Sequence, residues 1–131
     1  MNDAGDVRVL VIEADPGMRR FLRNTLQVQN YDVRETASGE EGVRLVRQAS
    51  PELVILDLGL PDRDGMELIG EIRSFSAVPI LVLSSRSDEK GKVTALDLGA
   101  DDYVSKPFGV DELMARMRTA LRHRLASEGS A

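Results

Sequence analysis

The hydrophobic positions of this chain follow two alternating patterns. Short apolar runs rich in β-branched residues predict five strands, at residues 7–12, 31–35, 53–56, 80–83 and 102–105. After each run, apolar residues recur at helical spacing and predict an amphipathic helix. The first, third and fourth runs are continuously apolar, which is typical of strands that helices cover on both faces. This alternation predicts an α/β fold with a parallel sheet and right-handed crossovers.

Local signals mark where the predicted helices start and stop. Asp15 followed by Pro16 indicates an N-cap and a first helical residue, and Ser38 with Glu41 has the pattern of a capping box. Gly99 predicts a left-handed C-cap after the fourth helix. The other three helices are expected to follow Asp64-Gly65, Ser87-Asp88 and Val110-Asp111.

Composition narrows the class of protein. The 131 residues fit one domain, and 17 basic against 22 acidic residues give a net charge of −5, which disfavours non-specific binding to nucleic-acid phosphates. The absence of cysteine excludes disulfides, thiolate metal sites and cysteine nucleophiles. The apolar runs are too short to cross a membrane and the N-terminus has no signal-peptide pattern, so we expect a cytoplasmic protein without a membrane partner.

Five polar side chains follow the predicted strands, at the end where an open α/β sheet binds its ligands. They are Glu13, Asp15, Asp57, Ser84 and Lys106. Each alone has an ordinary explanation, such as a helix cap, a turn or a solvated charge. Together at one rim they indicate phosphoryl capture, in which a carboxylate attacks phosphorus and forms an acyl phosphate. A Mg²⁺ ion held by carboxylates, a lysine and a hydroxyl would stabilise the incoming phosphoryl group.

Four parts of the chain carry a specific combination of motifs. They are Glu13 at the first strand end, LVILDLGLPDRDG (53–65), PILVLSSRSDEKGKVTALDLGADDYVSKPF (79–108) and ELMARMRTALRHR (112–124). From about residue 7 to residue 124, the chain resembles the receiver domain of two-component response regulators. LGLPDRDG and FSAVPILVLSSR resemble most the Kdp-type, potassium-responsive regulators of the winged-helix transcription-factor class. The resemblance implies a flavodoxin-like (βα)5 fold, a doubly wound parallel sheet with strand order 2-1-3-4-5.

The resemblance also implies roles for the residues at the rim. Asp57 would be the phosphoacceptor, and Ser84 would be the switch hydroxyl that moves toward the phosphoryl group. Lys106 would contact the phosphate, with a cis peptide bond to Pro107. Tyr103 would report the switch through the orientation of its ring. The expected Mg²⁺ ligands are Glu13, Asp57 and the backbone carbonyl of Gly59.

One position departs from the receiver pattern. Receivers carry two adjacent acids after the first strand, and here Glu13 is followed by Ala14. The second acid is the direct metal ligand, so the methyl group of Ala14 predicts weaker Mg²⁺ binding. Three explanations stay open: Asp15 or the longer Glu13 reaches the metal, the domain works without metal-dependent phosphorylation, or Ala14 is an engineered substitution.

In the winged-helix class, the fourth helix, fifth strand and fifth helix form a dimer face held by ion pairs. Exposed pairs of this kind select orientation more than they add affinity. We therefore expect Val93, Leu96 and Ala115 to supply the apolar contact, and phosphorylation to shift the population toward the dimer-competent state. The matching ion pairs are Lys92 with Glu112, Asp97 with Arg118 and Asp102 with Arg116.

These features predict a phosphorylation-controlled signalling switch rather than an enzyme. The expected partners are a sensor histidine kinase, a second copy of the chain, and DNA through an output domain outside this chain. We expect a disordered N-terminus at 1–6, the receiver domain at 7–124, and a flexible tail or linker start at 125–131. The alternative is an atypical receiver that acts as a phosphorylation-independent interaction module, and an enzyme with an external substrate ranks third.

Overall fold

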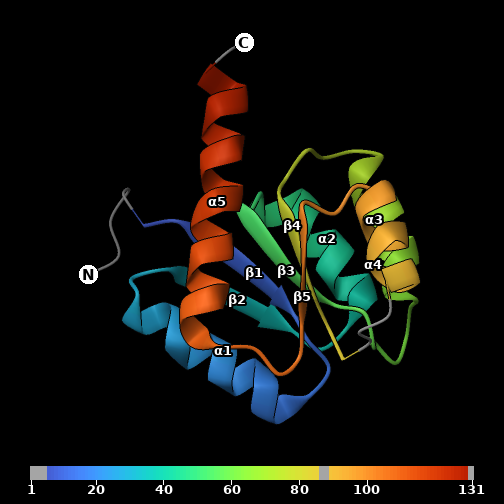
Figure 1. The fold of residues 1–131 in the computed structure, drawn as a ribbon, viewed down its shortest axis with the longest axis horizontal. Coiled ribbons are helices and arrows are strands. Elements are labelled where there is room, and N and C mark those ends of the chain that lie inside the picture. The colour runs from blue at the N-terminus through green and yellow to red at the C-terminus, as the bar shows by residue number, and fades with distance from the viewer. Residues whose placement is uncertain (1–5, 86–88, 130–131) are drawn as a thin grey trace.

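The computed structural model of the chain describes residues 6–85 and 89–129, with residues 124–129 described by their backbone alone. Strands and helices alternate along this chain (Figure 1). The strands are β1 (Arg8–Ile12), β2 (Asp32–Thr36), β3 (Leu53–Asp57), β4 (Ile80–Ser84) and β5 (Asp102–Ser105). The helices are α1 (Pro16–Val28), α2 (Gly39–Ala49), α3 (Gly65–Arg73), α4 (Glu89–Asp97) and α5 (Val110–Gly129).

The strands form one parallel sheet in the order β2-β1-β3-β4-β5, which confirms the predicted strand order. The order in which strands are added to the sheet reverses between β1 and β3, because β2 lies on one side of β1 and the later strands lie on the other. In open α/β sheets, ligands bind beyond the carboxyl ends of the strands at such a switch point. In the register of the sheet, Asp57 of β3 lies opposite Leu83, and Ser84 of β4 lies opposite Ser105. The ends of these strands therefore share one edge of the sheet.

Helices cover both faces of the sheet. Figure 1 shows α1 and α5 on one face and α2, α3 and α4 on the other. Side chains of β1 alternate between the two layers: Val9 and Val11 pack with α1 and α5, and Leu10 and Ile12 pack on the opposite face. Every residue of β3 and β4 is buried, which explains why these strands read as continuous apolar runs.

Two of the predicted N-caps form as expected, and one capping box forms only in part. Asp15 accepts from the N–H of Met18 at 2.7 Å, and Ser38 accepts from the N–H of Glu41 at 3.1 Å. The reciprocal contact from Glu41 to the N–H of Ser38 is not made. Thr36 at the end of β2 takes that place: its hydroxyl oxygen accepts from Ser38 N–H at 3.1 Å and its O–H donates to Glu41.

The turns around α4 and α5 agree with the sequence where the structure describes them. Gly99 has a φ of 119°, as predicted for the end of α4, and the peptide bond between Lys106 and Pro107 is cis. Ser87 and Asp88, predicted to precede α4, lie outside the described residues, as does most of the predicted N-terminal segment.

Helix α5 is longer than the sequence interpretation assumed. It runs to Gly129, so residues 125–129 of the expected flexible tail have a helical backbone. The reason is the composition of this stretch: leucine, alanine and glutamate favour the helix, and no proline or glycine interrupts it before Gly129. No helix within the described ranges has both the length and the apolarity to cross a membrane.

Candidate functional site

Three charged side chains meet at the carboxyl-terminal edge of the sheet. Glu13 follows β1, Asp57 ends β3, and Lys106 follows β5. Lys106 Nζ lies 3.0 Å from Glu13 Oε1 and 3.4 Å from Asp57 Oδ1. Glu13 is only 1% exposed and Asp57 only 7%. The fold therefore brings together three of the predicted site residues from distant parts of the chain.

Backbone groups fix the orientation of both carboxylates. The N–H of Gly59 donates to Asp57 Oδ1 at 3.1 Å, and the N–H of Asp15 donates to Glu13 Oε2 at 3.1 Å. Arg19 of α1 reaches back to the loop after β1 and donates to the carbonyls of Glu13 and Ala14, at 2.9 and 3.2 Å. These bonds hold the two acids in place before any ligand arrives. The contacts of Gly59 and Arg19 carry no local sequence signal.

Ser84 and Tyr103 occupy buried positions near this edge. Ser84, the last residue of β4, is 2% exposed, and its carbonyl accepts from the backbone N–H of Lys106 at 2.7 Å. Tyr103 in β5 is 4% exposed and belongs to the apolar cluster under α2, α3 and α4. Its ring thus occupies an inward position in this structure.

The electrostatics of the site are dominated by burial. Loss of water raises the pKa of Glu13, and the adjacent Asp57 raises it further. The N–H of Asp15 and the ammonium of Lys106 act in the opposite direction, but the pKa of Glu13 stays above its ordinary value. Two carboxyl groups therefore share a single ammonium, and a further anion at this site requires additional positive charge.

The oxygen donors suit a hard cation that keeps several of its water ligands. Of the expected ligands, Glu13 and Asp57 lie together at the rim and Gly59 contacts Asp57 through its N–H, whereas Ala14 offers no side-chain oxygen. Asp15, the further candidate ligand, is exposed and caps α1 through Met18. In the part of the chain that the structure describes, no three Asp, Glu, His or Cys side chains gather closely enough to hold a metal by themselves.

The residues of the predicted dimer face lie on α4, β5 and α5. Arg116 contacts both carboxylate oxygens of Asp102 at 3.2 and 3.0 Å, and Glu112 at 3.2 Å, so the predicted pair of Asp102 and Arg116 forms within one chain. The exposed residues of this face include two large apolar side chains, Val93 at 47% and Leu96 at 38%. Also exposed there are Lys92, Asp97, Ala115 and Arg118.

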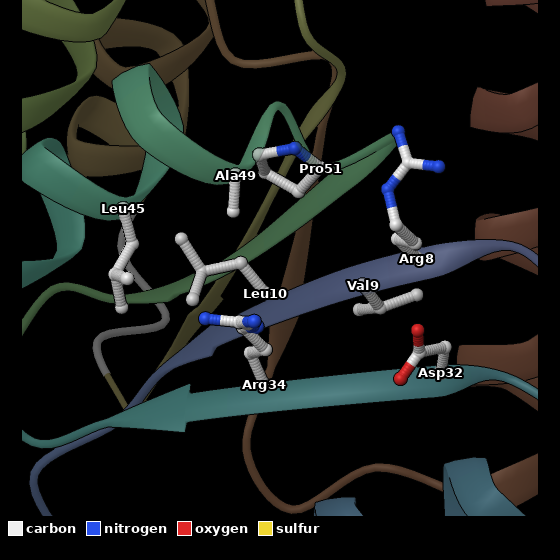
Figure 2. Close-up of a pocket in the computed structure, with 8 residues that line it drawn as sticks. All are labelled: Arg8, Val9, Leu10, Asp32, Arg34, Leu45, Ala49 and Pro51. Atoms are coloured by element: carbon white, nitrogen blue, oxygen red, sulfur yellow. The ribbon is translucent and has the colours of Figure 1, made fainter.

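A hollow at the opposite end of the sheet is unrelated to this site (Figure 2). It lies beside Arg8 and Asp32, the first residues of β1 and β2. Its volume of about 30 Å³ leaves room for about one water molecule, so we assign no ligand to it. The lining residues are Arg8, Val9, Leu10, Asp32, Arg34, Leu45, Ala49 and Pro51.

Comparison with known proteins gives consistent matches over most of the chain. The response regulator receiver domain family matches residues 9–118. The KDP operon transcriptional regulatory protein KdpE of Escherichia coli (strain K12) is 50% identical over 119 residues, which cover 91% of this chain and 53% of that protein. The transcriptional regulatory protein KdpE of Mycobacterium tuberculosis (strain ATCC 25618 / H37Rv) is 47% identical with the same coverage. The chain spans about half the length of the curated relatives it matches.

Solved structures show the same architecture. The BeF3-activated N-terminal receiver domain of Klebsiella pneumoniae RstA is 30% identical with a TM-score of 0.85, covering 88% of this chain and 98% of that chain. A CheY-like response regulator receiver domain protein from Methanospirillum hungatei JF-1 has a TM-score of 0.89 at 22% identity, covering 94% and 99%. The second likeness shows the fold alone.

Proposed function

This chain belongs to the response regulator receiver domain family, and we propose that it accepts a phosphoryl group on Asp57 from a sensor histidine kinase. One observation carries the proposal. Lys106 Nζ lies 3.4 Å from Asp57 and 3.0 Å from Glu13, at the rim where three parallel strands end. A carboxylate nucleophile beside a partly buried cation is the arrangement that transfer of an anionic group to an acid requires.

In the proposed reaction, a carboxylate oxygen of Asp57 attacks the phosphorus atom of a phosphohistidine. The new O–P bond forms as the P–N bond breaks, and the imidazole leaves with the electron pair. Lys106 is close enough to Asp57 to donate to a phosphoryl oxygen attached there. The Ser84 hydroxyl, at the same edge, would donate to a second phosphoryl oxygen.

Receiver domains generally bind Mg²⁺ at their phosphorylation site. In this chain Glu13, Asp57 and the carbonyl of Gly59 would hold the ion. When bound, the ion supplies positive charge that offsets the carboxylates and the phosphoryl group. Because Ala14 provides no ligand, we expect the affinity for Mg²⁺ to be lower than in a receiver with two adjacent acids.

Phosphorylation would be read out through Ser84, Tyr103 and the face on α4, β5 and α5. Ser84 would move toward the phosphoryl group, and an inward Tyr103 would favour dimer formation. Tyr103 is already inward here, at 4% exposure, so the face can be assembled without a large movement of that ring. The pair of Asp102 and Arg116 would organise the face within each chain, leaving Lys92 with Glu112 and Asp97 with Arg118 to cross between chains.

The output of the switch would be control of transcription. Both KdpE relatives are named as transcriptional regulatory proteins, and each is about twice as long as the matched region. We therefore assign DNA binding to an output domain outside this chain, in keeping with the net charge of −5.

A second candidate function is favoured by Ala14. If the metal binds too weakly for phosphoryl transfer, the domain would act as a phosphorylation-independent interaction module through the same face. Lys106 already offsets part of the charge of Glu13 and Asp57, so the fold does not need a metal ion to hold these acids together.

A Mg²⁺ titration followed by treatment with acetyl phosphate and intact mass measurement tests the proposal. We expect one phosphoryl group on the native chain and none on Asp57→Asn. Ala14→Asp should lower the Mg²⁺ concentration needed for half-maximal modification by about tenfold, a typical effect of a single metal-supporting residue. Equal modification of Asp57→Asn would contradict the proposal, and no modification together with a phosphate-free dimer would favour the interaction module.

A further inference from the structure

The loop after the acceptor, residues 58–64, connects β3 to α3 and carries Gly59. At its start, the N–H of Gly59 donates to Asp57 Oδ1 at 3.1 Å. At its end, Asp64 caps α3 by accepting from the N–H of Met66 at 3.0 Å. Contacts that hold the middle of this loop therefore also help to hold the Gly59 N–H, which donates to the carboxylate of Asp57.

The middle of the loop is held by α2. Asp62 Oδ1 accepts from the N–H of Gly39 at 2.9 Å, and Oδ2 accepts from the N–H of Glu40 at 3.1 Å and the hydroxyl of Ser38 at 3.0 Å. A helix leaves its first N–H groups without partners, and the N-cap Ser38 covers only that of Glu41. Asp62 thus completes the cap of α2 from a distant part of the chain.

Arg63, the next residue of the loop, strengthens this attachment. Its guanidinium lies 3.3 Å from Glu40 in α2 and 2.6 Å from Glu71 in α3. The start of α2 is also tightly packed, because a Cβ added to Gly39 would come within 2.7 Å of Leu68 Cδ1. The loop cannot slide along α2 without losing these contacts.

We propose that Asp62 is a positioning residue for phosphoryl acceptance at Asp57, acting through the backbone of Gly59. The inference rests on the proposed function and deepens it. Asp62 holds the loop whose Gly59 N–H orients the acceptor and whose Gly59 carbonyl is an expected Mg²⁺ ligand. Because Ala14 supplies no side-chain ligand, binding of the ion depends more strongly on this backbone oxygen.

The role requires a carboxylate at position 62. Three donors from the start of α2 converge on its two oxygens, whereas an amide presents one oxygen and one NH₂ donor. Asp62→Asn would therefore keep the size of the side chain but lose at least one hydrogen bond. It would also remove a negative charge from the helix N-terminus, where such a charge is favourable.

The test compares Asp62→Asn with a matched control, Asp64→Asn, in the same loop. The control also exchanges a capping carboxylate for an amide, but Asp64 caps α3 and not α2. Two quantities are measured on each variant: the rate of Asp57 modification by acetyl phosphate at saturating Mg²⁺, and hydrogen exchange of the Gly59 amide by NMR. A third variant, Asp62→Glu, keeps both carboxylate oxygens.

We expect Asp62→Asn to slow the modification by about tenfold, since a displacement of about 1 Å at a reacting group can cost about a hundredfold. It should also speed exchange at Gly59. Asp64→Asn should keep the native rate and exchange, because its amide oxygen can still accept from the N–H of Met66. Asp62→Glu should restore part of the modification rate and part of the protection of the Gly59 amide from exchange. If Asp62→Asn does not fold, Asp62→Glu tests the inference instead. We then expect slower modification of Asp57 and faster exchange of the Gly59 amide than in the native chain.

Native rates and native Gly59 exchange in the folded Asp62 variants would overturn the inference, as would equal slowing by Asp64→Asn. A native chain that accepts no phosphoryl group would overturn the proposed function instead. In that case exchange at Gly59 still decides the role of Asp62: faster exchange in Asp62→Asn supports the link between α2 and the loop, and unchanged exchange contradicts it.

Discussion

At the scale of single residues, Lys106 faces two carboxyl groups from a side chain that is 19% exposed. Lys106→Met would leave Glu13 and Asp57 together without this cation. We expect the free energy of unfolding at neutral pH to fall by about 2 kcal/mol, below the full cost of breaking a buried pair because the lysine is partly exposed. Urea denaturation measures this, with Lys106→Arg as the charge-retaining control.

The loss of stability in Lys106→Met should depend on pH, and the pKa of Glu13 sets the direction of that dependence. The pKa of Glu13 is raised in the folded state, so its carboxyl binds a proton there at a higher pH than in the unfolded chain. Protonated Glu13 no longer needs the ammonium, so the deficit of Lys106→Met should shrink as pH falls through the raised pKa. A deficit that stays constant with pH would contradict this description of the site.

A second prediction at the scale of residues concerns the stability effect of replacing two glycines that lie within helices. A Cβ on Gly42 in α2 would lie 2.5 Å from Ile12 Cδ1 and 2.9 Å from its Cγ1, whereas a Cβ on Gly70 in α3 meets nothing within 4 Å. We expect Gly42→Ala to destabilise the fold by about 2 kcal/mol through overpacking. Gly70→Ala should stabilise it by about 0.5–1 kcal/mol. Thermal unfolding of the two variants measures the difference, with a lower Tm expected for Gly42→Ala and a higher one for Gly70→Ala. Equal changes of Tm in the same direction would contradict the close packing of Gly42 against Ile12.

At the scale of elements, the cap of α2 by Asp62 should be visible in acid unfolding. The N–H groups of Gly39 and Glu40 lower the pKa of Asp62 from 3.8 to about 2. A lowered carboxyl pKa stabilises the folded state above the unfolded value, and this contribution is lost as pH falls from 3.8 through about 2. The difference in urea midpoint between the native chain and Asp62→Asn should therefore narrow over this range. A difference independent of pH would contradict the charged cap.

Elements with a local pattern could be predicted from the sequence. The continuous apolar runs of β3 and β4 identified two fully buried strands, and Asp15 and Asp64 marked the starts of α1 and α3. The capping box at Ser38 was only half right because Thr36, in the preceding strand, competes for the same groups. The hydrogen bonds from the start of α2 to Asp62 join residues far apart in the chain, so no local sequence pattern predicts them.

At the scale of the whole molecule, topology explains why much of the site could be predicted. Parallel strands end at one edge, so residues that end or follow β1, β3 and β5 must gather there, and the contacts of Lys106 with Glu13 and Asp57 agree with this. Which residues touch depends on side-chain reach and loop geometry. Asp15 follows β1 as well, yet its carboxylate turns to Met18 and caps α1.

The proposed dimer provides a prediction at the same scale. Asp97 ends α4 and Arg118 lies on α5, and both are exposed. If they pair between chains, Asp97→Arg and Arg118→Asp should each weaken dimer formation in the presence of beryllofluoride, and the double variant should restore it. Size measurement by light scattering tests this. A double variant as monomeric as the single ones would contradict the pairing.

Identification of the phosphorylated residue tests the proposed function most directly. After treatment with acetyl phosphate and Mg²⁺, borohydride reduces an aspartyl phosphate to homoserine, and peptide mass spectrometry locates the altered residue. We expect homoserine at position 57 and at no other acid, and its loss when Lys106→Met removes the contacting ammonium. Homoserine at Asp15, hydroxynorvaline (the reduction product of a glutamyl phosphate) at Glu13, or an unmodified chain at saturating donor and metal would contradict the assignment of Asp57 as the acceptor.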